Sequence, residues 1–300
     1  ITLFTFILLL EASGYMARAA FLMDELMMRV GLNGRAFIPL LSSFACAIPG
    51  IMAARVIENE RDRLTTILIA PLMTCSARLP VYTLIIAAFI PPDPVWIFNL
   101  QGLVMFGLYI VGVISAVTVA FVLKRTVTKG RPQPLIMELP TYKLPDARDF
   151  FIGLWTRAAA FLKRAGTIIL GTSIVLWILA SYPASATTLR ETFAGKIGAV
   201  LEPLLAPIGF NLEISIALIP GLAAREVAVG ALGTVYAIQN PEDNAAGLAD
   251  VLQNAWPLST ALAFLAWYIF APQCFATLAT IRRETNSWRW TGFAFGYLIV

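Results

Sequence analysis

The sequence contains no histidine, only three cysteines and few charged residues. Without histidine, a transition-metal site would have to use Asp, Glu, Cys, Met, hydroxyl or backbone oxygen ligands. The odd number of cysteines, all in apolar segments, argues against a disulfide framework. Charged residues make up 13% of the 300 residues and hydrophobic residues 59%, whereas soluble domains are about 25% charged. The composition therefore predicts an integral membrane protein.

Two further absences narrow the class of protein. No segment matches the phosphate-binding pattern G-x-x-x-x-G-K-[ST], so no nucleotide site is predicted. With no histidine and no cluster of carboxylates at membrane depth, a membrane enzyme is disfavoured. The net charge of +4 is modest and lies mostly in short loops, which indicates membrane topology rather than nucleic-acid binding. Ile1–Leu10 and Thr291–Val300 are apolar runs without flanks, so we interpret the chain as a fragment of a longer protein.

Long apolar segments predict an all-α, polytopic transmembrane helical bundle. A spanning helix needs roughly 20 apolar residues, and Val95–Leu123 has no charge until Lys124. Two other apolar segments contain proline and glycine and are expected to be interrupted. The predicted spans are Leu64–Ile90, Val95–Leu123, Gly166–Tyr182 and Leu258–Ile281, and the interrupted segments are Phe37–Ile57 and Leu212–Ile238.

The two interrupted segments share a short motif. Ile48-Pro49-Gly50 and Ile219-Pro220-Gly221 each lie in an apolar context and are each followed by charged residues. Proline removes a backbone donor and glycine loosens the backbone, so we expect the helix to break at both motifs. Broken backbone at membrane depth is tolerated where it lines a cavity. Two such segments in corresponding halves indicate the central binding site of a transporter.

A Pro-rich, basic linker separates the two halves. We expect residues 1–123 to form the first repeat with its following helix, 124–165 a cytoplasmic linker, and 166–300 the second repeat. Within the linker, Asp146–Lys163 is expected to form an amphipathic helix on the membrane surface. Leu212–Ile238 is expected to be a re-entrant hairpin that turns near Arg225. The alternative, in which Ile197–Phe210 crosses the membrane, stays open.

All three cysteines lie close to helix-breaking prolines. Cys46 precedes Pro49, Cys75 follows Pro71, and Cys274 follows Pro272. A lone cysteine in a membrane helix is usually a small packing residue. Beside a break, however, a thiolate and a freed carbonyl can face one cavity, and this ligand pair suits a soft or borderline divalent cation. Ser42, Ser43, Thr74 and Ser76 lie near the cysteines and are expected to bond back to their own helices, with weak ligation as the alternative.

Ionisable residues at membrane depth are costly and are usually paired or functional. Glu226 is a candidate ligand, with a local pair to Arg225 as the simpler reading. Glu11 is another, with a helix end at the interface as the alternative. Arg78 needs a partner or snorkels to the interface. The mixed-charge run Glu58–Arg63 is expected to be solvated.

Several of these segments resemble signatures of the FeoB family of ferrous iron transporters. The resemblance covers nearly the whole chain, in order. The segments that resemble the family are Glu11–Arg18, Leu40–Gly50, Arg61–Tyr82, Gly221–Gly233 and Cys274–Trp288.

The resemblance implies two Gate-type repeats, a fold similar to concentrative nucleoside carriers, and transport of Fe²⁺ across the bacterial cytoplasmic membrane. It implies that the residues matching the family's metal-handling positions are Cys46, Cys75, Cys274 and Glu226, with Glu11 added more weakly. It also implies a GTP-binding domain outside this chain, small accessory Feo proteins as partners, and no permanently bound cofactor. A nucleoside-type solute carrier is the alternative, although Asn and Gln are scarce near the Pro-Gly motifs.

Overall fold

The computed structural model describes most of the chain. It leaves out residues 1–4, 6–7, 11, 93, 96–97, 130–145, 168–169, 172–173, 176–177, 180–181, 183–191, 224, 226, 237–244, 272–273 and 300. Two predicted site residues, Glu11 and Glu226, therefore lie outside the described residues. So do residues 130–145 of the linker and parts of the predicted span Gly166–Tyr182.

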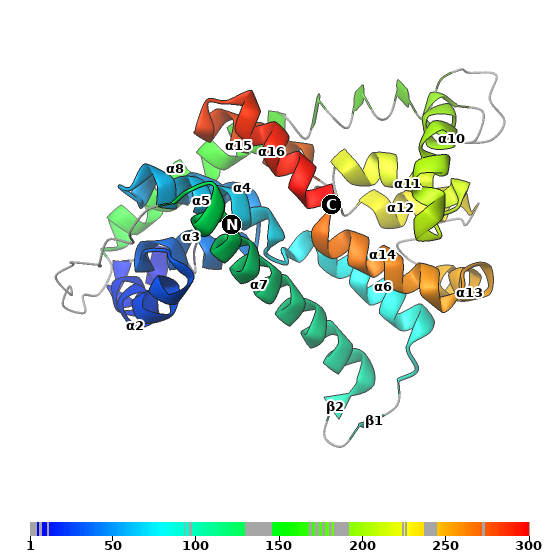
Figure 1. The fold of residues 1–300 in the computed structure, drawn as a ribbon, viewed down its shortest axis with the longest axis horizontal. Coiled ribbons are helices and arrows are strands. Elements are labelled where there is room, and N and C mark those ends of the chain that lie inside the picture. The colour runs from blue at the N-terminus through cyan, green and yellow to red at the C-terminus, as the bar shows by residue number, and fades with distance from the viewer. Residues whose placement is uncertain are drawn as a thin grey trace. The chain divides into compact units, whose positions relative to one another are not determined.

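The described chain is almost entirely helical (Figure 1), which confirms the predicted all-α class. Its strands are the two-residue pair β1 (Pro94–Val95) and β2 (Phe98–Asn99), which are antiparallel. In chain order the helices are α2 (Tyr15–Val30), α3 (Phe37–Ser43), α4 (Ala47–Ala53), α5 (Glu60–Ile69), α6 (Leu79–Phe89), α7 (Leu100–Thr126), α8 (Ala147–Phe161), α10 (Phe193–Leu205), α11 (Leu212–Ala223), α12 (Val227–Val235), α13 (Ala245–Ala255), α14 (Leu258–Phe270), α15 (Phe275–Thr285) and α16 (Trp288–Ile299).

Three helical stretches are long and apolar enough to cross a membrane: Glu60–Phe89, Leu100–Thr126 and Leu258–Thr285. They agree with three of the predicted spans. A fourth candidate is the pair Gly195–Ile208 and Leu212–Leu222, which is bent by 109° and is either a broken span or a re-entrant loop. The chain is therefore a multi-pass helical membrane protein, and the number of crossings near residues 195–222 stays open.

The chain divides into two compact units. Unit 1 contains Ile1–Ser76, Gly112–Thr167 and Thr277–Ala294, and unit 2 contains Ala77–Val111, Ile168–Ala276 and Phe295–Val300. Each unit takes segments from both halves of the sequence. The boundaries at residues 76/77 and 276/277 fall close to the two Pro-and-Cys sites. These units are defined by packing and do not test the predicted repeat boundaries, which stay a prediction.

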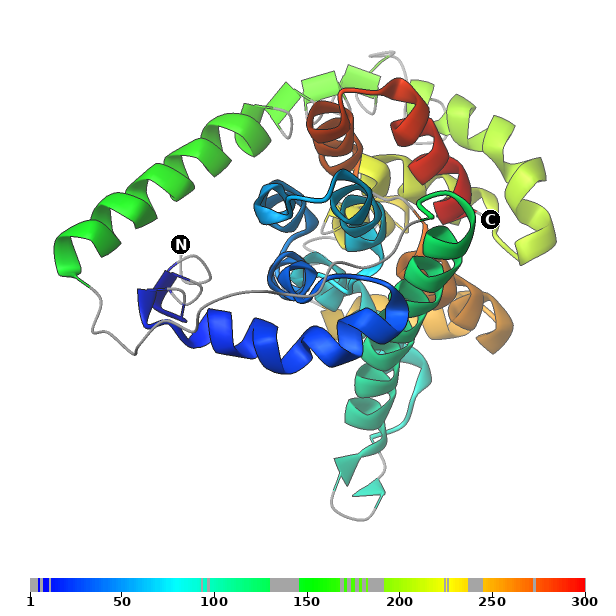
Figure 2. The ribbon, with the colours of Figure 1, turned by 60° about the vertical axis from the view of Figure 1, so that its left-hand side comes forward.

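Unit 1 is organised around the paired helices α3 and α4. The helix α2, long and blue in Figure 2, packs against α3 and against the 3-10 turn Gly34–Ala36. Asp24 of α2 accepts a hydrogen bond of 2.7 Å from the backbone N–H of Gly34, so a buried carboxylate fixes this turn. Helix α4 also contacts the turn Ala70–Leu72 that follows α5. The segment containing Cys46 is thereby packed against the segment that leads to Cys75.

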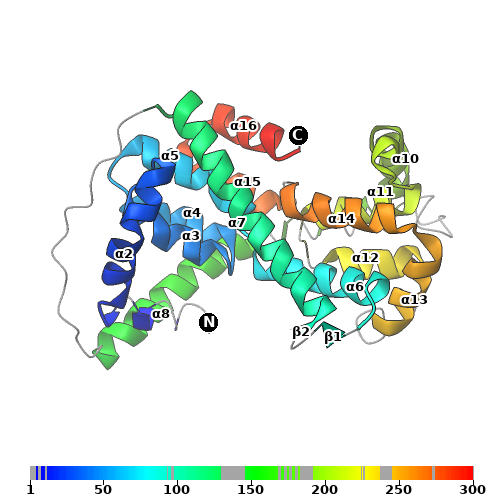
Figure 3. The same cartoon turned by 60° about the horizontal axis from the view of Figure 1, so that its bottom comes forward.

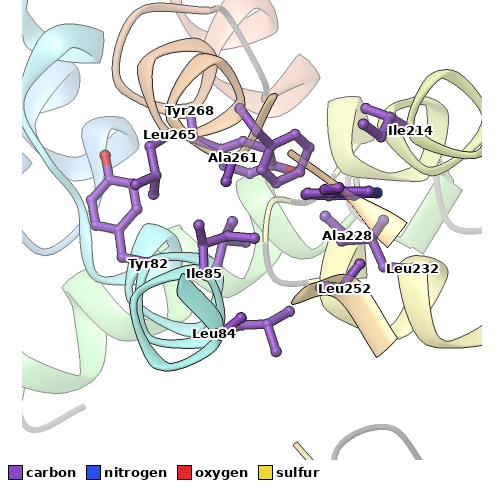
Figure 4. Close-up of a cluster of buried hydrophobic side chains, with 14 of the residues drawn as sticks. Tyr82, Leu84, Ile85, Ile214, Ala228, Leu232, Leu252, Ala261, Leu265 and Tyr268 are labelled. Atoms are coloured by element: carbon purple, nitrogen blue, oxygen red, sulfur yellow. The ribbon is translucent and has the colours of Figure 1, made fainter. Parts of the chain in front are cut away.

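Unit 2 has one hydrophobic core. Helix α6 packs against α12, α13 and α14, as Figure 3 shows. In Figure 4, Tyr82 and Ile85 of α6 face Leu265 and Tyr268 of α14. Helix α6 begins just after the first Pro-and-Cys site, and α14 ends just before the second. This core therefore holds one helix of each broken span in place.

The structure corrects the expected role of the Pro-Gly motifs, because neither breaks its helix. Pro49 is the third residue of α4, where the first-turn N–H groups have no partner inside the helix, so it removes no hydrogen bond. The interruption lies upstream, where Cys46 is extended with φ −157° and ψ 134°. Pro220 lies inside α11, which continues to Ala223 before the chain turns. The second interruption is therefore near Arg225, as expected.

The glycines of the two motifs allow close packing instead. A Cβ on Gly50 would meet the Ser43 side chain and would lie 2.7 Å from the Pro39 carbonyl oxygen, so α3 and α4 approach closely only with glycine there. A Cβ on Gly221 would lie 3.0 Å from the Tyr268 hydroxyl and 3.3 Å from the Ala228 Cβ. The shared sequence motif thus marks a shared packing requirement.

The predicted amphipathic helix is present as α8. Asp146 caps its start by accepting a hydrogen bond of 2.9 Å from the Arg148 N–H. Its exposed apolar side chains include Phe151, Ile152 and Trp155, and Trp155 is 77% exposed. An exposed apolar face beside basic residues is typical of a helix at a membrane surface, which stays a prediction.

Candidate functional site

The first broken span is interrupted at residues 70–78. Helix α5 ends at Ile69, and a 3-10 turn from Ala70 to Leu72 has Pro71 in its first turn. Met73 is extended with φ −60° and ψ 132°, and a second short turn, Ser76–Arg78, leads into α6. Cys75 lies in the non-helical part between the two turns. The predicted break between Pro71 and Cys75 is confirmed.

A side-chain hydrogen bond joins this break to the interruption before α4. The Ser76 hydroxyl donates to the Ala45 carbonyl oxygen at 2.9 Å. Ala45 immediately precedes Cys46, and Ser76 immediately follows Cys75. Both cysteines are partly buried and neither is in a disulfide. The structure therefore brings together the two chain segments that contain Cys46 and Cys75, within unit 1.

The hydroxyl side chains beside the cysteines differ from expectation in two of four cases. Ser42 and Ser43 bond back to the carbonyls of Ile38 and Pro39, as predicted. Ser76 instead bonds across to Ala45. Thr74 also lies outside a helix, so it has no carbonyl one turn back to accept its hydrogen bond.

Thr74 is a buried polar residue of the first break. It is 1% exposed, and its Oγ1 has no hydrogen-bond partner in the part of the chain that the structure describes. A Cβ on Gly112 of α7 would lie 2.5 Å from this oxygen, so glycine leaves room for it. A buried oxygen without a partner is uncommon in folded proteins. Thr74 immediately precedes Cys75 in the sequence.

The second broken span is interrupted between α14 and α15. Ala271 ends α14 with φ −65° and ψ 147°, and Cys274 directly precedes α15. Cys274 is partly buried. The position of the break agrees with the one predicted around Pro272 and Cys274.

A buried arginine contacts this second break. Arg225, in the segment between α11 and α12, is 6% exposed. Its Nη2 donates to the Ala271 carbonyl oxygen at 3.3 Å. Sequence analysis placed Arg225 at a hairpin turn, with Glu226 as its local partner, and missed this contact, which joins residues far apart in the chain. The one available signal was an arginine inside an apolar segment.

The mixed-charge run at the start of α5 is not fully solvated, contrary to expectation. Asp62 is completely buried and pairs with Lys124 of α7, whose side chain is 6% exposed. Close by, the Thr65 and Thr128 hydroxyls share a hydrogen bond of 2.8 Å. Residues 62 positions apart form the pair, so no local pattern could reveal it. These contacts fix the end of α7 against α5.

A second ion pair lies at the end of α15. Arg55 donates to both carboxylate oxygens of Glu284, at 2.6 and 2.8 Å. The pair joins the turn after α4 to the last turn of the second broken span, both in unit 1.

The five predicted metal-handling residues are only partly placed. Cys46 and Cys75 lie in unit 1 and Cys274 in unit 2, while Glu11 and Glu226 are not described. Within the described ranges, no group of three or more Cys, Asp or Glu side chains is close enough to hold a metal. The predicted ligand set therefore stays a prediction.

Family models match most of the chain. A model described as "Gate: Nucleoside recognition" matches residues 1–89 and 162–288. A second, described as "Ferrous iron transport protein B C terminus", matches residues 105–157. The two matches alternate along the chain, so the second falls between the two parts of the first.

Curated relatives cover the whole chain. A protein named Fe(2+) transporter FeoB from Leptospira interrogans is 44% identical over 320 residues, covering 99% of this chain and 46% of the relative. A protein of the same name from Staphylococcus aureus is 41% identical over 303 residues, covering 100% of this chain and 44% of the relative. The chain thus spans about half the length of the curated relatives it matches. No solved structure matches it.

Proposed function

Since the chain belongs to the FeoB family of Fe(2+) transporters and corresponds to its membrane-spanning part, we propose that its parent protein moves Fe²⁺ across the cytoplasmic membrane into the cell. In this proposal, the Fe²⁺ ion passes through the part of the protein that this chain forms. Names of the relatives support the substrate, and the apolar spans support the location in a membrane.

The observation that supports a metal path best is the first break. Two partly buried thiols, Cys46 and Cys75, lie on segments joined by the Ser76–Ala45 hydrogen bond. The buried Thr74 oxygen beside them has no protein partner in the described chain. Sulfur and oxygen ligands together suit a borderline cation such as Fe²⁺. The thiols must lose their protons to bind it.

A few weak ligands suit transport better than a closed cage. An ion that is held by many strong ligands is not released, whereas conduction requires binding that is weak enough to leave. Cys274 at the second break, with Glu226 and Glu11, would provide further contacts along the path. These three assignments rest on the family and on their positions in the sequence.

The remaining partners belong to the rest of the parent protein. We expect a GTP-binding domain outside this chain, small accessory Feo proteins, and the lipid bilayer as partners, and no nucleic acid. GTP would then act through that domain, with no permanently bound cofactor in this part. The chain itself would transport rather than catalyse.

The nucleoside-carrier alternative is not favoured. The word nucleoside occurs in the description of the Gate model, but the curated relatives are named for Fe(2+) and the central segment matches a ferrous iron model.

The test is anaerobic uptake by proteoliposomes that contain the full-length parent protein. Radiolabelled Fe²⁺ and a radiolabelled nucleoside are offered in parallel, with protein-free liposomes as the control. The proposal predicts uptake of Fe²⁺ above the control and no uptake of the nucleoside. Nucleoside uptake without Fe²⁺ uptake would reverse the assignment.

A further inference from the structure

Helix α10 has a stripe of exposed apolar side chains. Thr192 caps the start of the helix by accepting a hydrogen bond of 3.3 Å from the Gly195 N–H. From there the stripe residues follow one another at intervals of three or four, so they lie on one face of the helix. They are Phe193, Ile197, Val200 and Leu204, with exposed fractions of 48%, 41%, 70% and 70%. A continuous apolar face of this kind marks a contact with lipid or with another protein.

The opposite face of α10 packs on α11. A Cβ on Gly198 would lie 2.6 Å from the Ile216 side chain and 3.2 Å from the Ile216 backbone, so the two helices cross in close contact at this pair. Gly195 and Gly198 are both buried, and so is Ile216. Because the buried and the exposed positions lie on opposite sides of α10, the stripe points away from the core of unit 2.

Helix α11 runs alongside α14 and in the same direction. At the start of both helices, the Thr260 hydroxyl donates a hydrogen bond of 3.0 Å to the Gly209 carbonyl oxygen. In the last turns of the same two helices, a Cβ on Gly221 would lie 3.0 Å from the Tyr268 hydroxyl. Helix α14 is the first part of the candidate span Leu258–Thr285. Helix α11 therefore enters the membrane at the level where α14 enters it.

Helix α10 lies across this direction. The bend of 109° between Gly195–Ile208 and Leu212–Leu222 is close to a right angle, and Figures 1 and 3 both show α10 running across the direction of α14. With 13 residues, α10 is about 20 Å long, which is too short for the roughly 30 Å of a hydrocarbon core. Its contact residue Ile216 is one turn into α11, at a depth of about 6 Å along that helix.

We propose that α10 lies in the plane of the membrane, at the boundary between headgroups and acyl chains of the leaflet in which α14 begins, with its apolar stripe against lipid. Interfacial helices bury their apolar face about 5–10 Å into this boundary, which agrees with the depth of the crossing. Beside the stripe, the Lys196 ammonium lies 5.6 Å from the centre of the Phe193 ring. A lysine placed there keeps its stem on apolar surface and its charge among the headgroups. Residues 197–210 then do not cross the membrane.

Nitroxide spin labels measure the depth of α10. Ile197→Cys, Val200→Cys and Leu204→Cys are labelled one at a time in the full-length protein without its native cysteines, reconstituted in proteoliposomes. Collisions of the label with O₂, which dissolves in acyl chains, and with a water-soluble nickel chelate give the depth. The matched controls are Leu262→Cys and Phe270→Cys, at exposed positions eight residues apart on α14.

The three α10 labels should collide with O₂ more than with the nickel chelate, and all should lie about 5–10 Å deep. The two α14 labels should differ in depth by about 12 Å, because each residue of a crossing helix adds 1.5 Å. If α10 crossed the membrane, its labels at 197 and 204 would differ by about 10 Å.

A measurement on the wild type decides the case in which the cysteine-free protein does not fold. Two phospholipids carry a photoactivated carbene precursor, one near the headgroup and one at the end of an acyl chain. The shallow probe should label α10 along its whole length, as it labels the start of α14. The deep probe should label the end of α14 and leave α10 unlabelled.

Three results would overturn the proposal. One is a depth that changes steadily along α10, which would make it a crossing helix. Another is a stripe reached by the nickel chelate and not by O₂, which would place it in water. The third is a stripe that neither reagent nor probe reaches, which would mean that a protein segment or a second copy of the chain covers it. Uptake of Fe²⁺ is not measured in any arm, so failure of the proposed function leaves this test unchanged.

Discussion

The Ser76 hydroxyl donates a hydrogen bond of 2.9 Å to the Ala45 carbonyl oxygen, across 31 residues of sequence. The bond links two non-helical segments, one just before α4 and one inside the first broken span. Each of these segments contains a cysteine next to the bonded residue. This bond is the structural observation that brings the segments of Cys46 and Cys75 together.

Gly50 should not tolerate a side chain. In Gly50→Ala, the new methyl group would lie 2.7 Å from the Pro39 carbonyl oxygen and would also meet Ser43. Overpacking of this kind costs about 1–3 kcal/mol. We expect a clear loss in the free energy of unfolding, measured by denaturant titration in detergent. Gly102→Ala is the control, because nothing lies within 4 Å of its Cβ position.

Adding Ser43→Ala should not restore Gly50→Ala to wild-type stability, because the Pro39 carbonyl belongs to the backbone and remains in place. Full rescue by Ser43→Ala would show that the hydroxyl alone limits the approach of α3 to α4.

The buried ion pair between Asp62 and Lys124 should respond unequally to single and double substitution. Asp62→Leu or Lys124→Met leaves one buried partner uncompensated, which costs about 3–5 kcal/mol. The double variant Asp62→Leu with Lys124→Met should be less destabilised than either single change. The unfolding free energies of wild type, the two single variants and the double variant give the interaction energy between the two side chains. Additive losses would contradict the pairing.

The exposed pair Arg29–Glu25 provides the contrast. Both side chains are more than 70% exposed, with values of 74% and 77%. Exposed pairs of this kind contribute little. Glu25→Gln should therefore leave unfolding unchanged in the same assay.

Thr74 should matter for ion handling more than for folding. Its hydroxyl has no protein partner in the described chain, so Thr74→Val removes a buried polar group at no cost in hydrogen bonds and should leave stability equal or higher. If the oxygen contacts the ion, the KM for Fe²⁺ uptake should rise several-fold.

Thr118→Val is the matched control for Thr74→Val, since the Thr118 hydroxyl donates to the Ile114 carbonyl of its own helix. An unchanged KM in Thr74→Val, together with lower stability, would assign Thr74 a purely structural role.

The pattern of apolar runs predicted the helical class and the principal spans, because the length and hydrophobicity of a helix determine whether it can cross a membrane. It also located the breaks near Cys75 and Cys274, where proline interrupts the hydrogen-bond ladder. It misplaced the interruption of Phe37–Ile57, since Pro49 falls in the first turn of α4, where proline is harmless. The glycine of each motif proved to serve packing, which depends on a neighbouring helix.

Long-range polar contacts could not be predicted. Asp62 was expected in solvent because its neighbours in the sequence are charged, and its burial depends on Lys124 in another helix. The contact between Arg225 and Ala271 likewise joins segments 46 residues apart. Such pairings are set by the tertiary packing of apolar helices and leave no periodic signal in the sequence.

The most direct test of the central claim is anaerobic ⁵⁵Fe²⁺ uptake by the full-length protein in proteoliposomes, comparing wild type with Cys46→Ser, Cys75→Ser and Cys274→Ser. Serine is close to cysteine in size but has no thiol that could lose a proton and bind a metal. The account predicts that Cys46→Ser and Cys75→Ser fold normally and lose most of their uptake. Wild-type uptake in all three folded variants would contradict it and make the cysteines packing residues.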